Sequence, residues 1–174
     1  AQIRYTSGDF QLAFENPETT ITPNGGGTRI VSDDNEFPDV VLRYNIKSND
    51  LNLVAAALVR QLTYNDGAGI DSSETSYGLS LTGKWMLGED DIRFGVNTGS
   101  GLGRYIGLNV ANGAVINGSG ELEAIDSTAL FASYRHVIGD GWRANFVVST
   151  ISVDNDTALT GTAVTKTATS FRIN

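Results

Sequence analysis

The chain has 174 residues with no cysteine, 20 glycines, and 20 acidic against 12 basic residues, for a formal charge of −8. This length suits a single domain, and the acidic balance with dispersed arginines argues against a nucleic-acid-binding surface. Without cysteine, the chain has no disulfides and no thiolate metal site.

Apolar and polar residues alternate along nine segments, which is the pattern of β-strands with one buried face. In chain order they are Ala1–Thr6, Phe10–Glu15, Asp39–Lys47, Leu51–Gln61, Tyr77–Leu87, Asp91–Thr98, Ser127–Ile138, Trp142–Ile151 and Thr167–Asn174. No segment has a convincing helical period, although the stretch 101–125 has room for a short helical turn. The sequence therefore predicts an all-β protein.

The connections between these segments alternate in length. Short turns containing Gly, Asn or Asp occur at Ser7–Asp9, Ser48–Asp50, Gly88–Asp90 and Gly139–Gly141. The long polar connections are Asn16–Pro38, Thr63–Ser76, Gly99–Asp126 and Val153–Lys166. Short turns at one end and long loops at the other are typical of an antiparallel up-and-down transmembrane β-barrel.

One side-chain parity of the nine segments is apolar and carries no charge. Six of its aromatic residues lie within a few residues of a short turn: Tyr5, Phe10, Tyr44, Trp85, Tyr134 and Trp142. Aromatic residues at one level of an apolar face are typical of the girdle at a membrane–water interface. An alternative is that they are core aromatics of a soluble ligand-binding β-barrel or sandwich.

The opposite parity is polar and holds seven of the nine arginines: Arg4, Arg43, Arg60, Arg93, Arg135, Arg143 and Arg172. The carboxylates lie instead in turns, loops and strand ends, so the pattern predicts a water-filled lumen with a positive wall. Six apolar residues interrupt this parity: Val54, Ala56, Leu58, Phe131, Val147 and Ile151. A bulge, or packing against an inserted loop, would explain them.

Arginine side chains in a lumen would attract small carboxylates, because a guanidinium stays charged and binds a carboxylate through two parallel hydrogen bonds. The predicted solute-contacting residues are Arg43, Arg60, Arg93, Arg135, Lys84 and Arg104, with Arg4 and Arg143 at the pore mouth. The alternative for part of this set is pairing with loop carboxylates. The Gly-rich segment Gly101–Leu108, with Arg104 and Tyr105, is predicted to fold inward as a pore constriction, or else to be an ordinary external loop.

Seven short stretches are similar to the trimeric outer-membrane porins of the DcaP type, which are associated with dicarboxylate uptake. They are AQIRY (1–5), FENPETT (14–20), PDVVLRY (38–44), LVRQL (58–62), GLGRYIGL (101–108), GELEAI (120–125) and YRH (134–136). The resemblance implies a homotrimer in the outer membrane of a Gram-negative bacterium and a barrel of about sixteen strands. Residues 1–174 would then be one porin domain lacking N- and C-terminal strands; closure as an eight-stranded barrel is the geometric alternative.

Neither catalysis nor a cofactor is predicted. His136 is the only histidine, and its parity points it outward near a short turn, whereas a Ser–His–Asp site would need it beside a serine in a cleft. An outer-membrane-anchored hydrolase is the competing interpretation. One histidine without cysteine supports no metal site, and the acidic loop clusters are expected to be solvated, or else to bind cations that bridge lipopolysaccharide.

Overall fold

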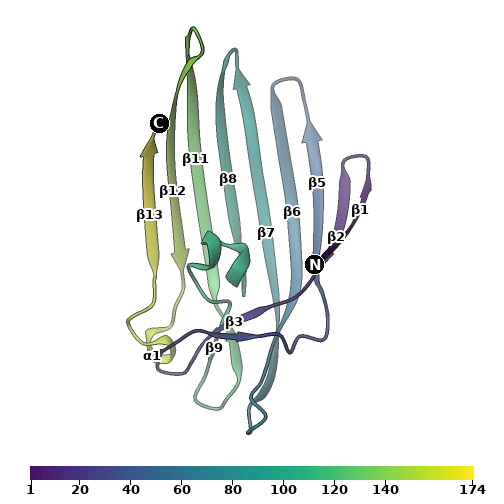
Figure 1. Ribbon diagram of the computed structural model, residues 1–174, viewed down its shortest axis with the longest axis vertical. Helices are drawn as coiled ribbons and strands as arrows, with labels where there is room; N and C mark the ends of the chain where they lie inside the picture. Colours follow the sequence, from purple (N-terminus) through teal and green to yellow (C-terminus); the bar gives the residue numbers. More distant parts are fainter.

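The computed structural model describes residues 1–174, with the exception of the side chain of Leu108. Nine strands form one antiparallel sheet, and each of them pairs with the next of the nine in chain order (Figure 1). They are β1 (Gln2–Ser7), β2 (Phe10–Glu15), β5 (Asp39–Lys47), β6 (Leu51–Asn65), β7 (Asp71–Leu87), β8 (Asp90–Ser100), β11 (Asp126–Gly139), β12 (Trp142–Val153) and β13 (Thr167–Ile173). The nine predicted strands and the all-β class are confirmed.

The largest difference from the sequence prediction concerns the hairpin of β6 and β7. Their register continues to the pair Asn65–Asp71, so the predicted long connection 63–76 is mostly strand and only residues 66–70 form a loop. Both faces of this extension are rich in polar residues, which hides the period-2 signal. Glu74 consequently lies inside a strand, contrary to the prediction for carboxylates.

The other long connections contain short elements that the alternation pattern did not reveal. β3 (Thr19–Thr22), β4 (Ile30–Ser32), β9 (Ala114–Ile116) and β10 (Leu122–Ala124) form a second sheet in the order β10-β9-β3-β4. Two 3₁₀-helical turns, η1 (Gly103–Tyr105) and η2 (Gly107–Asn109), follow β8, and α1 (Thr157–Thr160) precedes β13. The helical turn allowed for in 101–125 is therefore present. The described residues contain no helical segment with the length and hydropathy that a membrane-spanning helix requires.

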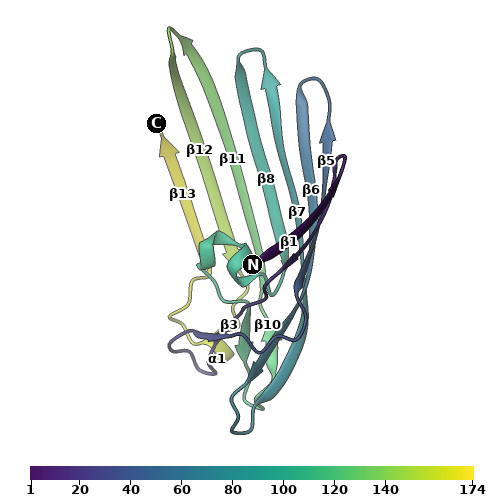
Figure 2. The same cartoon turned by 45° about the vertical axis from the view of Figure 1, so that its right-hand side comes forward.

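These connections pack on one face of the large sheet, near the end opposite the short turns (Figures 1 and 2). We call this the inner face and the opposite one the outer face. Leu58 and Ile151 of the inner face are buried in a cluster with Leu102, Ile106 and Val115 from the long connections. Packing against an inserted segment thus explains two of the six apolar residues that interrupt the polar parity.

The outer face carries the apolar parity and is exposed. Leu42, Leu81 and Phe146 expose 43%, 41% and 41% of their surface, although they lie in the interiors of their strands. A soluble barrel or sandwich requires these side chains to pack together inside a core. The described residues show no such core on this face.

The sheet is open along β1 and β13. Its strand order begins with β1 and ends with β13, and no described backbone pairing joins these two strands. Closure as a small eight-stranded barrel is therefore wrong for this arrangement.

Candidate functional site

A basic cluster lies on the inner face near the short turns, at the junction of β7, β8 and β11. Asp91 is buried there, with its Oδ1 at 2.9 Å from Arg93 Nε and its Oδ2 at 2.8 Å from Arg135 Nε. The Lys84 ammonium lies 3.8 Å from the same Oδ2. The register brings the four together, because it pairs Lys84 with Arg93 and Arg135 with Asp91. Three cations surround one carboxylate, so the cluster has a net positive charge.

The cations of this cluster are open to solvent to different degrees. The Arg93 and Lys84 side chains are 51% and 39% exposed, whereas Arg135 is more covered and also donates to the Glu89 carbonyl. Arg93 donates its Nε–H to Asp91 Oδ1, which orients its guanidinium plane, whereas Arg135 lies at ion-pair distance from Oδ2 without a hydrogen bond to it. Lys84, Arg93 and Arg135 therefore form a positively charged, partly exposed surface on the inner face, and their contact with an anionic solute stays a prediction.

Arg60 corrects the sequence prediction, because it is buried. Its Nε lies 3.3 Å from Asp39 Oδ1, and its terminal nitrogens donate to the carbonyls of Glu18, Gly101 and Leu102. Only 1% of its side chain is exposed. The prediction that Arg60 contacts solute is wrong, and its role is to hold the 101–106 segment against β6.

Arg104 and Tyr105 of η1 complete this anchor from the loop side. Arg104 donates to Asp39 Oδ2 at 3.0 Å and to the Asn16 carbonyl. The Tyr105 hydroxyl lies 2.9 Å from both Asp39 Oδ2 and Glu15 Oε2, and its ring contacts the Arg60 and Arg104 guanidinium groups. Burial raises the pKa of Tyr105, so the phenol stays protonated and can donate a hydrogen bond. Arg104 is thus mainly an anchoring residue, although a quarter of its side chain is exposed.

The segment Gly101–Leu108 lies on the inner face, as expected of an inward-folded loop. Leu102 and Ile106 are buried against the sheet, and Gly101 has a φ of +69°, which a glycine adopts without strain. Leu108 belonged to the predicted constriction, but its side chain lies outside the described residues. The segment therefore packs on the sheet, and its role as a pore constriction stays a prediction.

The remaining predicted cations lie outside both the basic cluster around Asp91 and the anchor around Asp39. Arg43, on β5, donates to Gln11 Oε1 at 3.1 Å and is half-buried on the inner face. Arg4 donates to Gln2 Oε1 at 2.9 Å near the β1 edge, and Arg143 is exposed beside the turn between β11 and β12. Both lie close to short turns, and their position at a pore mouth stays a prediction.

The six predicted girdle residues all point away from the loops and are exposed: Tyr5, Phe10, Tyr44, Trp85, Tyr134 and Trp142. Phe10 pairs with Tyr44, and the register continues from Tyr44 through Ala55 to Leu81, which lies four residues from Trp85 on β7. Trp85 and Tyr134 both pair with Ile92. Such an offset between register partners is expected for side chains at one height of a sheet with tilted strands, because neighbouring tilted strands are staggered along their length.

His136 shares the outer face with this girdle. Its Nδ1 lies 3.0 Å from Asp90 Oδ2, and the Tyr134 hydroxyl bonds the same oxygen at 2.5 Å. Its side-chain partners among the described residues are thus Asp90 and Tyr134 rather than a serine. No group of three or more potential metal ligands occurs among the described side chains.

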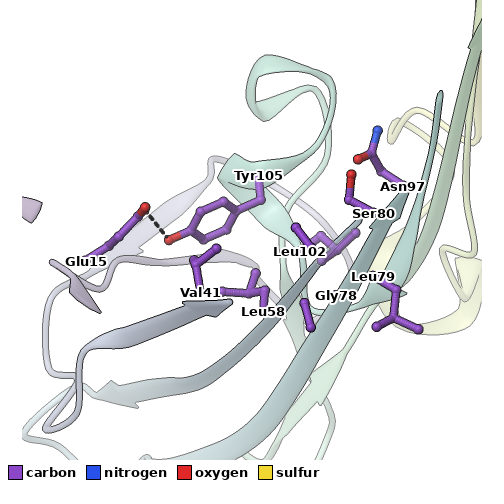
Figure 3. Close-up of a pocket in the computed structure, with 11 residues that line it drawn as sticks. Glu15, Val41, Leu58, Gly78, Leu79, Ser80, Asn97, Leu102 and Tyr105 are labelled. Atoms are coloured by element: carbon purple, nitrogen blue, oxygen red, sulfur yellow. Dashed lines mark hydrogen bonds between the residues drawn. The ribbon is translucent and has the colours of Figure 1, made fainter. Parts of the chain in front are cut away.

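The sequence alone did not identify Asp39 and Asp91, the carboxylates at the centres of the two inner-face groups of cations. It also did not reveal a pocket beside η1. Asp39 and Asp91 are fully buried, yet each lies at the beginning of a strand and resembles a turn residue in the sequence. Their position on the polar parity was the available signal. The pocket has a volume of about 240 Å³ and lies between η1 and strands β5 to β8 (Figure 3).

Comparisons with known proteins identified no matching family model, no matching curated protein and no matching solved structure.

Proposed function

We propose that this chain is part of the wall of an outer-membrane porin that allows small anionic solutes, such as dicarboxylates, to diffuse through a lumen lined by basic residues. The outer face contacts the bilayer and lipopolysaccharide, and further strands close the wall between β1 and β13. Assembly as a homotrimer, as in the porins that the sequence resembles, belongs to the same proposal.

The observation that carries the proposal is the exposed apolar outer face. On β7 this face runs from Leu87 to Tyr77, all exposed at alternate positions except Gly83. Ten residue steps correspond to about 33 Å along a strand, or about 25 Å of bilayer depth at the tilt of about 40° found in such barrels. Beyond Tyr77 the same parity changes to Thr75 and Ser73, as expected where a strand leaves the hydrocarbon region.

The inner face supplies a mechanism without covalent chemistry. Lys84, Arg93 and Arg135 offer a net positive surface, and Arg43 adds a cation on β5. Such groups replace part of the hydration of a passing carboxylate, and they must bind weakly enough to release it. The loop segment 101–106, held by Arg60 and Asp39, narrows the path on the same face.

Single-channel recording of the intact protein in planar bilayers tests this function. We expect anion-preferring conductance, and we expect the triple variant Arg43→Gln, Lys84→Gln, Arg93→Gln to lower the anion-to-cation permeability ratio severalfold. Arg135 is retained so that buried Asp91 keeps a partner. Lys166→Gln, in the connection before β13, is the control and should change the ratio little. Cation preference, or unaltered anion preference in the triple variant, would contradict the proposed role of these residues.

A further inference from the structure

Asp91 is the only carboxylate among the described residues that lies within ion-pair distance of three basic side chains. Asp39, the other buried acid of the inner face, holds a long connection in place, because its partner Arg60 also bonds loop carbonyls. The partners of Asp91 come from β7, β8 and β11, and Arg135 donates to the Glu89 carbonyl in the adjoining short turn. Anchoring of a long connection therefore does not explain this carboxylate.

The cations around Asp91 lie on the open part of the inner face. Lys84 and Arg93 are register partners on β7 and β8, and their side chains are 39% and 51% exposed. The long connections pack near the other end of the sheet (Figure 1). An anion that reaches the basic cluster therefore meets Lys84 and Arg93, whereas Asp91 is fully buried and stays out of its reach.

The charge of Asp91 opposes the attraction that its partners exert on an anion. Three cations against one carboxylate leave two positive charges in excess. A Coulomb energy is proportional to the product of the charges, so the repulsion by Asp91 is about twice as large for a dianion as for a monoanion at the same place. Salt screens a buried charge less than an exposed one.

We propose that Asp91 is a specificity-determining residue for the anionic solute, because its buried charge weakens the binding of dianions to the basic cluster more than the binding of monoanions. The inference rests on the proposed porin function and adds a residue that acts through its neighbours. Conduction requires a site that attracts a solute and also releases it. The cluster without the charge of Asp91 would hold a dianion more tightly and release it more slowly.

The test compares butanedioate with butanoate, which have equally long chains and differ by one charge at mildly alkaline pH. Calorimetric titration of the intact protein in detergent micelles gives both dissociation constants, and low ionic strength keeps the charge effect measurable. Asp91→Asn removes the charge with little change in shape. We expect it to raise the ratio of the butanoate to the butanedioate dissociation constant at least threefold. An unchanged or lower ratio would overturn the inference.

Arg135→Gln provides a second background, in case Asp91→Asn alone prevents folding. Asp91 keeps Lys84 and Arg93 as partners in this background, and the double variant with Asp91→Asn restores the net charge of the parent cluster. The ratio should fall in Arg135→Gln and return to about the parent value in the double variant. A contribution of Asp91 to shape alone would not produce this return, so a double variant that keeps the ratio of Arg135→Gln contradicts the inference.

Asp90→Asn is the matched control. It changes the total charge of the protein equally, but the Asp90 carboxylate bonds Tyr134 and His136 on the outer face, so the ratio should change little. An equal increase in this control would show that total charge, rather than the cluster, sets the preference.

Binding in micelles does not depend on conductance, so the two proposals can fail separately. An anion-preferring pore whose ratio does not respond to Asp91→Asn contradicts only the role of Asp91. The expected change of ratio in a protein that forms no pore contradicts only the transport function.

Discussion

Asp39 and Arg60 form an ion pair that solvent does not reach. Asp39 Oδ1 lies 3.3 Å from Arg60 Nε, and their side chains are 0% and 1% exposed. They lie on adjacent strands, one position beyond the register pair Val40–Val59. The pair joins the sheet to the loop because Arg60 also donates to the carbonyls of Gly101 and Leu102.

Replacing Arg60 by methionine should therefore destabilise the protein strongly. The change removes a charge that balances buried Asp39 and leaves two loop carbonyls without this donor, so we expect a loss of about 3–5 kcal/mol. Urea unfolding in detergent measures the loss. Lys47→Met is the control, because its pair with Asp9 is exposed and should contribute at most about 1 kcal/mol. A similar small effect for both variants would contradict the anchoring role of Arg60.

Gly101→Ala should detach the inward segment. Gly101 has a φ of +69°, and a Cβ there would collide with Ser76 Oγ and come within 2.9 Å of Leu62 Cδ1. We expect a loss of about 3 kcal/mol from strain and overpacking together. Limited proteolysis between residues 101 and 125 should accelerate accordingly. Gly88→Ala has nearly the same φ, +66°, but open space around it, so it isolates the backbone cost of about 1–2 kcal/mol.

The two faces of β7 should respond in opposite ways to a new charge. Leu81→Arg places a guanidinium on the outer face and should cost about 2–4 kcal/mol of folding free energy in a bilayer. Thr82→Arg places the same group on the inner face, where water is available, and should cost much less. Unfolding of both variants in lipid vesicles measures the difference. Equal costs would mean that the outer face does not contact lipid.

The loop between β6 and β7 should loosen in acid. Asp66 Oδ1 accepts the backbone N–H groups of Ala68 and Ile70 at 2.8 and 2.9 Å, and these bonds lower the pKa of Asp66. A carboxyl whose folded pKa is lowered stabilises the loop above its unfolded pKa of about 3.9, and this stabilisation disappears as the pH falls through the lower folded value. Hydrogen exchange at Ala68 and Ile70, corrected for intrinsic rates, should therefore accelerate in acid. Asp66→Asn should remove this pH dependence.

The sequence determined which residues share a face. Alternation has a period of two residues, so the side chains of Leu79, Leu81 and Trp85 must lie on the same side of any strand that contains them. The outward aromatic residues and the inward basic residues followed from this local geometry. It also placed the short turns, because Gly, Asn and Asp mark them directly.

Tertiary structure alone decided which inward residues are buried. Arg60 meets Gly101 across 41 residues, and Tyr105 meets Glu15 across 90, so no local pattern distinguishes buried Arg60 from exposed Arg93. The same long-range packing formed the β3-β4-β9-β10 sheet and enclosed the pocket beside η1. The physical reason is that burial depends on which segment covers a side chain, and a segment distant in sequence leaves no trace in the period of the strand it covers.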